Sequence, residues 1–400
     1  MSKNINVPKL RFKEFSGEWE EKKLSDIAIF SRGKGISKSD IVKNGNVECI
    51  RYGELYTHYK EIVNNIYSKT NLDKKDLILS EYGDVIIPSS GETQIDIATA
   101  SCILKDNVAL GGDLNIIKTK DNGVFLSYYL NSKKKFDIAK LSQGISVVHL
   151  YSSQLKQLTI NIPQKQEQEK IALFLASVGE KIEQLIKKDE LLQQYKKSII
   201  QKIFSQEIRF KTDNLNAFTE WKKEKLGKYL VEFKSKSIFE NQYPVLTSSN
   251  KGLMLQSDYF GENRLTEREN KGFNIVPNNY ITYRSRSDNR IFTFNINTLG
   301  YTGIISTYYP VFESKNTDSR FIVTLLNNNK YFIGKYSVGT SQTVLSFNEL
   351  KNIKMLIPCL EEQNKIANFL SSIDDKIEKN QKQLEKIKEF KKALLQQMFI

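Results

Sequence analysis

The sequence from Ile162 to Phe204 reads IPQKQEQEKIALFLASVGEKIEQLIKKDELLQQYKKSIIQKIF. A second stretch, from Ile357 to Phe399, reads IPCLEEQNKIANFLSSIDDKIEKNQKQLEKIKEFKKALLQQMF. The two align without a gap at an offset of 195 residues, and 19 of their 43 positions are identical. Because both open with Ile-Pro and share Glu-Gln and Lys-Ile-Ala in the same register, we interpret them as copies of one duplicated unit.

The repeat continues upstream of both stretches. Ser142-Gln-Gly-Ile-Ser146 corresponds to Ser337-Val-Gly-Thr-Ser341 at the same offset. A Trp-x-x-x-Lys-Leu element opens each half of the chain, at Trp19 and at Trp221. The duplication therefore covers both halves rather than the helical stretches alone.

The middle parts of the two halves differ. Residues 30–138 and 234–333 show little alignable identity. Repeated flanking sequences around two different middle segments are what we expect of two domains that recognise different targets on a common scaffold. An old duplication whose interiors drifted without functional consequence would give the same pattern.

Both duplicated stretches carry an apolar stripe that predicts a long helix. The stripe advances by alternating steps of four and three residues, which is the period of a coiled-coil seam. A helix of about 35 residues would be roughly 50 Å long, and an antiparallel pair would hold two domains at opposite ends of a rod. A coiled coil that serves only dimerisation is the alternative. The expected seam residues are Ile171, Leu175, Val178, Ile182, Leu185, Leu192, Ile199, Ile366, Leu370, Ile373, Ile377, Leu384, Ile387 and Leu394.

The expected fold class is α/β (α+β), with two similar domains related by a pseudo-twofold. The length of 400 residues exceeds what one hydrophobic core usually serves. We expect domains at residues 1–163 and 207–358 and long spacer helices at residues 164–206 and 359–400. Mixed, largely antiparallel sheets are expected in both domains. Strands are predicted at 76–79, 83–87, 114–117, 280–283 and 291–294, and helices at 124–130 and 320–326.

The charge balance is strongly basic. Sixty lysines and arginines stand against 46 acidic residues, for a formal net charge of +14. A polyanion partner would suit this charge, although a lysine-rich surface on an ordinary soluble protein would also produce it. No apolar run is long enough to cross a bilayer, and the start lacks the apolar stretch of a signal peptide, so we expect a cytoplasmic protein with no membrane partner.

No catalytic constellation is recognisable. The three cysteines are far apart, and only two histidines are present, which disfavours a metal site. A Gly-x-x-x-x-Gly-Lys-Ser/Thr loop and an Asn-Pro-Pro-aromatic motif are both absent from the sequence. We therefore expect no catalytic residue, no metal and no cofactor bound by this chain.

Several polar loops suit contacts to double-stranded DNA. Arginine can bind the edge of guanine, glutamine and asparagine can bind adenine, and serine, threonine and lysine can bind phosphates. For any single residue the plainer interpretation is a solvated side chain, and for His149 a partly packed one. The candidates in the first domain are Arg32, Lys34, Ser89, Ser90, Thr93, Gln94, Ser142, Gln143, Ser146 and His149. Those in the second are Arg284, Ser285, Arg286, Arg290, Ser337, Ser341, Gln342 and Thr343, of which the three arginines form the best cluster.

The order and duplication of these elements resemble the specificity subunit of type I restriction–modification systems over essentially the whole chain. The resemblance rests on the two Trp-x-x-x-Lys-Leu elements and on Ile-Pro followed by Glu-Gln-x-x-Ile-Ala. These are Ile162-Pro163 with Glu167-Gln-Glu-Lys-Ile-Ala172, and Ile357-Pro358 with Glu362-Gln-Asn-Lys-Ile-Ala367. One departure is that the family often has a second proline after Ile-Pro, where this chain has Gln164-Lys-Gln166 and Cys359-Leu-Glu361.

The resemblance implies a non-catalytic subunit that reads a split, asymmetric DNA site, one half with each domain, across a spacer set by the helices. It also implies two methyltransferase subunits that use S-adenosylmethionine, and restriction subunits that use ATP and Mg. The helix exteriors and the shared frames would dock the methyltransferase subunits. Two alternatives stay open: a stand-alone two-headed DNA-binding or architectural protein, and a nuclease or methyltransferase with an unrecognised site.

Overall fold

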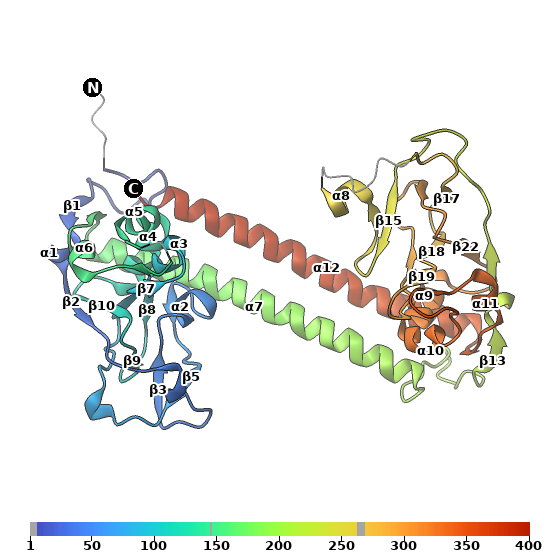
Figure 1. The fold of residues 1–400 in the computed structure, drawn as a ribbon, viewed down its shortest axis with the longest axis horizontal. Coiled ribbons are helices and arrows are strands. Elements are labelled where there is room, and N and C mark those ends of the chain that lie inside the picture. Colours follow the sequence, from blue (N-terminus) through green and yellow to red (C-terminus); the bar gives the residue numbers. More distant parts are fainter. Residues whose placement is uncertain (1–5, 145, 262–268) are drawn as a thin grey trace. The chain divides into compact units, whose positions relative to one another are not determined.

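A computed structural model describes residues 6–144, 146–261 and 269–400. The chain divides into two compact units, residues 1–187 with 381–400, and residues 188–380. Each unit contains one globular domain and part of both long helices, α7 (Lys165–Phe204) and α12 (Leu360–Gln397) (Figure 1). These are the two helices that the duplicated apolar stripes predict.

The first unit is built on two small sheets. The larger one has the strand order β2-β10-β6-β8-β4, and its neighbours are antiparallel except for the parallel pair β4–β8. Its strands are β2 (Ala28–Arg32), β4 (Ile62–Val63), β6 (Val85–Pro88), β8 (Ser101–Ile103) and β10 (Leu114–Thr119). The second sheet joins β3 (Val47–Ile50) to β5 (Ser68–Thr70) antiparallel and to β9 (Ala109–Leu110) parallel. The predicted mixed, largely antiparallel sheet is confirmed.

Short helices and two-stranded ladders complete this domain. The helices are α1 (Leu24–Ile27), α2 (Glu54–Thr57), α3 (Gln94–Ile97), α4 (Gly123–Ser132), α5 (Lys135–Leu141) and α6 (Ser152–Lys156). The ladders are β1 (Glu20–Lys23) with β12 (Thr159–Ile162), and β7 (Ser90–Gly91) with β11 (Val148–His149). Helix α4 begins at the cap residue Asn122, whose side chain accepts a hydrogen bond from the Phe125 amide.

The second unit has one four-stranded antiparallel sheet, in the order β14-β22-β18-β20. Its strands are β14 (Leu230–Glu232), β18 (Ile281–Tyr283), β20 (Phe294–Ile296) and β22 (Val311–Ser314). The helices are α8 (Gln256–Phe260), α9 (Ser319–Asn328), α10 (Lys330–Gly334) and α11 (Phe347–Asn352). Four ladders are β13 (Lys222–Lys225) with β24 (Lys354–Ile357), β15 (Leu246–Ser249) with β16 (Gly252–Leu255), β17 (Asn274–Val276) with β21 (Gly303–Ile305), and β19 (Arg286–Ser287) with β23 (Thr343–Val344).

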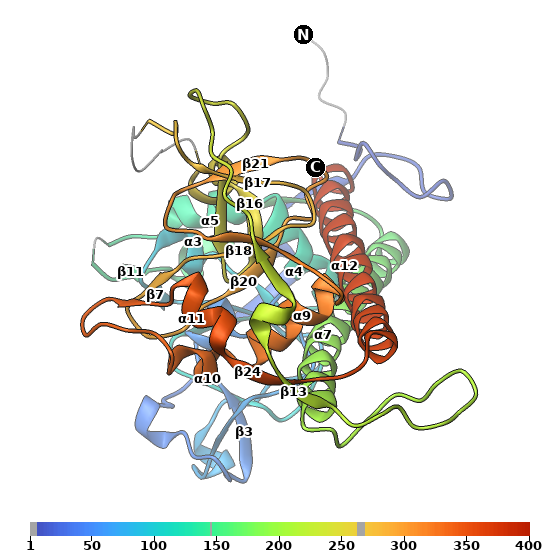
Figure 2. The ribbon, with the colours of Figure 1, turned by 90° about the vertical axis from the view of Figure 1, so that its right-hand side faces the viewer.

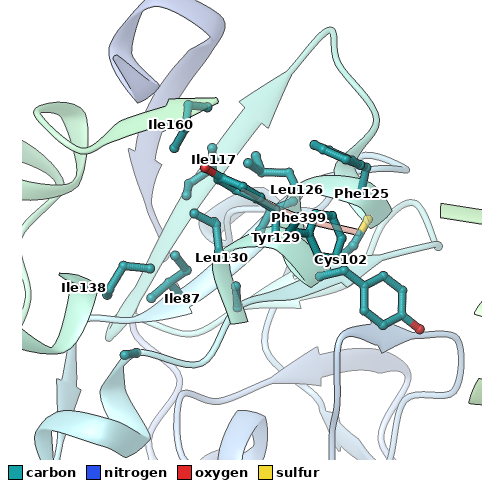
Figure 3. Close-up of a cluster of buried hydrophobic side chains, with 14 of the residues drawn as sticks. Ile87, Cys102, Ile117, Phe125, Leu126, Tyr129, Leu130, Ile138, Ile160 and Phe399 are labelled. Carbon is teal, nitrogen blue, oxygen red and sulfur yellow. The ribbon is translucent and has the colours of Figure 1, made fainter. Parts of the chain in front are cut away.

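An aromatic cluster closes the core of each domain. In the first unit, Phe399 follows the end of α12 and lies with Phe125 and Tyr129 of α4, with ring centroids 5.5 and 5.7 Å away (Figure 3). In the second unit, Phe204 at the end of α7 lies 5.7 Å from Phe321 of α9. Each domain is therefore closed by the end of the long helix that begins after the other domain.

The apolar stripes have a wider role than a coiled-coil seam. In the first unit, Ile171 and Leu175 of α7 share one buried cluster with Leu394 of α12 and with side chains of the domain. In the second unit, Ile366 of α12 shares a cluster with Ile203 of α7 in the same way. Because the start of one helix meets the end of the other, the helices pack antiparallel, as predicted. The first half of each stripe also belongs to a domain core, which a seam alone does not require.

Lys196 and Lys391 stand between apolar stripe residues, where the helix period would place another apolar side chain, and both form ion pairs. The Lys391 ammonium is 3.0 and 3.1 Å from the Glu61 carboxylate oxygens and 5.1 Å from the Tyr128 ring centroid. Lys196 pairs with Asp374 in the second unit. These positions therefore bind specific partners on the helices or the domain.

Two predicted strands differ from the structure. At 76–79, a 3-10 turn (Lys74–Asp76) capped by the Asp73 side chain replaces the start of the strand, and only Leu79 makes a single bridge. At 291–294, the strand begins at Phe294, because the Ile291 amide donates to side chains of the preceding turn instead of to a ladder. Short apolar runs do not distinguish these conformations by period.

Across the described ranges, no helix has both the length and the apolarity needed to cross a membrane.

Candidate nucleic-acid interface

The candidate loops of each domain pair with one another. In the first domain, β7 pairs with β11, with Ser90 opposite His149. In the second, β19 pairs with β23, with Arg286 opposite Val344. Each pair joins segments more than fifty residues apart in sequence, so the structure brings the predicted loops together at one place on each domain.

The same hairpin frame supports both loops. Gln143 bridges His149, and Val338 bridges Val344, by antiparallel backbone hydrogen bonds. Gly144 and Gly339 follow with φ of 122° and 113°, a region that side chains with a Cβ rarely adopt. A Cβ at Gly144 would also lie 2.0 Å from the Val147 carbonyl oxygen. The glycines in the two Ser-x-Gly-x-Ser copies are therefore required by the turn.

The tips of the two hairpins differ. Gln143 and Val147 are exposed in the first domain where Val338 and Gln342 are exposed in the second, while Ser146 and Ser341 are exposed and identical. Ile145, within the first loop, lies outside the described residues. A common backbone thus presents different side chains to solvent.

Four of the candidate hydroxyl residues are buried and bonded to the protein backbone or a neighbouring side chain. Ser142 donates to the Ala139 carbonyl at 2.5 Å, and Ser337 donates to the Gly334 carbonyl at 2.7 Å. The Thr343 hydroxyl donates to the Ser287 carbonyl, and the Ser89 hydroxyl accepts from Arg32. The four buried residues are Ser89, Ser142, Ser337 and Thr343. In this structure they hold the loops in shape.

A polar network surrounds Arg32 in the first domain. Its guanidinium donates to the Gly112 carbonyl at 3.0 Å and lies 3.2 Å from an Asp113 carboxylate oxygen. Ser90 joins Asp113 at 3.4 Å and His149 at 3.3 Å. Because the Arg32 and Asp113 side chains are about half exposed, water weakens this ion pair and leaves the guanidinium accessible.

The loop that carries Arg32 and Lys34 approaches another turn very closely. A Cβ at Gly33 would lie 2.0 Å from the Gly111 carbonyl oxygen. The amides of Gly33 and Lys34 donate to the carbonyls of Leu114 and Leu110. Only glycine allows this contact, and it directs the exposed Lys34 side chain into solvent.

The segment after β7 forms helix α3. Thr93 is its cap residue, and its hydroxyl accepts a hydrogen bond from the Asp96 amide at 3.1 Å. Gln94 is exposed in the first turn. Thr93 is therefore occupied by the local structure, while Gln94 faces solvent.

The arginines of the second domain are held in different ways. The Arg286 guanidinium lies 4.0 Å from the Tyr308 ring centroid, a cation–π contact that orients it. Arg290 has a φ of 57° and donates to the Gly339 carbonyl of the hairpin at 3.3 Å. Arg284 is exposed. The predicted cluster is brought together beside the hairpin, and Ser285 fixes it by donating to the Tyr308 carbonyl at 2.8 Å.

Sequence reasoning missed the residues that orient these basic groups. Asp113 and Tyr308 lie far along the chain from the arginines they contact, and neither was among the candidate residues. Asp288, within the arginine loop, accepts from Gln342 at 3.5 Å and was also missed, because its partner lies 54 residues further along the chain. A possible signal was the Gly111-Gly112-Asp113 turn, but its partner loop is recognisable only in three dimensions.

A buried polar lock explains the repeated Trp and Glu of the frame. Glu167, in the first turn of α7, accepts two hydrogen bonds from Arg11 at 2.8 and 2.7 Å and one from the Trp19 indole at 3.3 Å. Glu362 accepts from Arg209 at 3.2 and 2.9 Å and from Trp221 at 3.2 Å. Each glutamate ties the opening segment of a domain to the helix that follows it.

The repeated glutamine performs a second task. The Gln168 side chain donates to the Pro163 carbonyl and accepts from the Asn122 amide at 2.9 Å, at the start of α4. Gln363 donates to the Pro358 carbonyl and accepts from the Asp318 amide at the start of α9. The Glu-Gln pair therefore fixes the entry of each long helix to two parts of its domain.

Among the described residues, no three His, Cys, Asp or Glu side chains gather in a way that could hold a metal ion.

Comparison with known proteins gives one consistent family. The family described as "Type I restriction modification DNA specificity domain" matches this chain twice, at residues 16–194 and 220–389. The type I restriction enzyme MjaVIII specificity subunit of Methanocaldococcus jannaschii is 26% identical, over 96% of this chain and 94% of that protein. The putative MjaX specificity subunit of the same organism is also 26% identical, over 98% and 95%. The crystal structure of the type I restriction–modification S subunit from M. genitalium has a similar fold, with a TM-score of 0.62 at 16% identity, over 98% of this chain and 99% of that one.

Proposed function

Because the chain belongs to the family of type I restriction–modification DNA specificity domains, which matches most of its length in two copies, we propose that its two domains read the two halves of a split, asymmetric DNA site. The main support for this proposal is the pair of equivalent hairpins, bridged at Gln143–His149 and at Val338–Val344. Both domains hold the same turn with the same buried serine, while the exposed tips differ. A shared frame with different tips is what two half-sites of unlike sequence require.

The exposed members of the candidate set make the contacts. Arginine and glutamine side chains bind base edges, and lysine and serine bind phosphates. The exposed candidates are Arg32, Lys34, Thr93, Gln94, Gln143, Ser146, Arg284, Arg290, Ser341 and Gln342. Ser90, His149, Ser285 and Arg286 are less exposed and orient their neighbours. The net charge of +14 supports a duplex as partner.

Its relatives are named specificity subunits, and in this proposal the chain is likewise a specificity subunit, without catalytic activity of its own. Two methyltransferase subunits that use S-adenosylmethionine bind it, and restriction subunits that use ATP and Mg join the complex. The antiparallel helices set the number of base pairs between the half-sites. In this proposal the catalytic residues of the complex belong to the methyltransferase and restriction subunits, and this chain contributes none.

The test is to exchange one domain interior. Residues 30–138, together with the hairpin tip 143–147, are replaced by the corresponding segments of a family member with a known target, and the chain is produced with its methyltransferase subunits. Methylated positions are then mapped in the host genome. The new site should differ from the original in one half only.

A change in both halves would contradict the division between the domains. Purification of the wild-type complex provides the second measurement. Failure to recover an S-adenosylmethionine-binding protein at two copies per chain would favour a stand-alone DNA-binding protein.

A further inference from the structure

Each domain presents one highly exposed aromatic side chain at the same place. Phe136 on α5 is 67% exposed, and Tyr331 on α10 is 70% exposed. Each lies two residues before a completely buried isoleucine, Ile138 or Ile333, so the two positions correspond. Within the described residues, neither ring packs against another aromatic ring.

These aromatics are rigidly connected to the candidate reading hairpins. The buried Ser142 binds the Ala139 carbonyl of α5, and Ser337 binds the Gly334 carbonyl of α10. In the first unit α5 packs on α3, which contacts β7 and β11 (Figure 2). In the second unit α10 packs directly against the arginine loop, since a Cβ at Gly334 would lie 2.1 Å from the Arg290 carbonyl oxygen.

The recurrence of the exposed ring requires an explanation. A single exposed aromatic is ordinary on a protein surface. Two at matched positions, in domains whose interiors differ, point to a ligand that is the same at both domains. The sugar–phosphate backbone of any duplex meets this condition, and so does a protein partner present in two copies.

The charge around the rings favours the DNA backbone. Residues 133–140 contain four lysines and one aspartate, and residues 328–336 contain two lysines and no acid. Lys140 and Lys335 are exposed, and the Lys330 ammonium lies 5.6 Å from the Tyr331 ring centroid. Lysine is depleted in protein–protein interfaces, whereas DNA interfaces are strongly positive.

We propose that Phe136 and Tyr331, with Lys140 and Lys335, form two equivalent sequence-independent contacts to the DNA backbone, one beside each half-site. The rings pack on the deoxyribose sugars, while the ammonium groups neutralise phosphates. This inference rests on the proposed function, since it assumes that each domain binds a duplex.

The test uses the full chain, purified with the subunits that bind it, and a labelled 40-base-pair duplex of random sequence, with fluorescence anisotropy as the readout. The double variant Phe136→Ala/Tyr331→Ala should bind about tenfold more weakly than the wild type, because both rings lose the apolar area that they bury on the sugars. The control Tyr82→Ala/Phe239→Ala removes two exposed rings from elsewhere and should bind as the wild type does. Lys140→Gln/Lys335→Gln should lower the slope of log affinity against log salt by about 1.8.

Three results overturn the inference. The first is wild-type affinity in the ring variant. The second is wild-type affinity combined with loss of a co-purifying protein subunit, which would make the surface a protein contact. The third is a wild-type chain that binds no duplex at all, and that result alone would also defeat the proposed function. Unchanged thermal melting of the variants shows that the fold is intact.

Discussion

Replacing Glu167 by alanine should destabilise the first unit by several kcal/mol, although the residue belongs to no active site. The side chain is completely buried at the start of α7 and accepts from both Arg11 and Trp19. The substitution leaves a largely buried guanidinium without its carboxylate, and an indole N–H without its acceptor.

The magnitude follows from these contacts. Breaking a buried ion pair by removing one partner costs about 3–5 kcal/mol. The Arg11 side chain is 12% exposed and also donates to the Gly17 and Ser16 carbonyls, so we expect the lower end of this range. The lost indole hydrogen bond adds roughly 1 kcal/mol. A total of about 4 kcal/mol would lower the melting temperature of a unit of this size by roughly 8–16 °C.

The two tryptophans provide the assay. The sequence contains only Trp19 and Trp221, which lie in equivalent locks of the two units. In a Trp221→Phe background, fluorescence during urea unfolding reports the first unit alone. Glu169→Ala changes an exposed glutamate in the same helical turns and serves as the matched control.

A loss below about 1 kcal/mol in the Glu167 variant, or an equal loss in the control, would refute the reasoning. The second lock offers a further check. Arg209 also pairs with Glu220 at 3.2 Å and is 19% exposed, so it keeps a carboxylate partner when Glu362 is removed. Glu362→Ala, measured in a Trp19→Phe background, should therefore cost less than Glu167→Ala.

Three other predictions come from close contacts, thiol burial and the helices. Gly33→Ala forces a Cβ against the Gly111 carbonyl and should lower the melting temperature and weaken DNA binding. A Cβ at Gly35 would meet no atom within 4 Å, so Gly35→Ala should do neither. Equal melting curves for the two variants would contradict this prediction. In native protein at pH 8, a thiol reagent should modify the exposed Cys359 rapidly but Cys49 and Cys102 only after unfolding. Burial raises the thiol pKa of Cys49 to about 11 and that of Cys102 to about 12, so neither is a thiolate at this pH. Rapid reaction of all three thiols would disprove the burial. Inserting seven residues in register into both long helices should lengthen the spacer of the methylated site without altering its half-sites, and an unchanged spacer would exclude the helices as its ruler.

The architecture was predictable because its signals are long and repeated. A gapless duplication of 43 residues with a 3.5-residue period predicts two long helices and their antiparallel pairing. Short elements were less predictable. At 76–79, one capped turn outweighs an apolar run, since a single side-chain hydrogen bond decides the conformation of so few residues.

The candidate interface was predictable in composition but not in arrangement. Glycine-containing loops with arginine and serine were recognisable, and the structure pairs them within each domain. Their exposure could not be inferred, because Ser142 and Ser146 stand four residues apart in one loop and have opposite environments. The partner of Arg286 was equally hidden, since a stacking contact with Tyr308 has no sequence period.

Identity between the two copies has two distinct physical origins in this chain. The Glu-Gln pairs are the most recognisable shared elements, yet all four side chains are buried and bound within their own domains. Their identity is explained by folding, so it gives no support to docking of a partner by these residues. Phe136 and Tyr331 show the opposite combination, since their aromatic character recurs although the fold leaves them in solvent. Recurrence combined with exposure, rather than recurrence alone, is therefore the criterion that separates a binding surface from a structural lock in a duplicated protein.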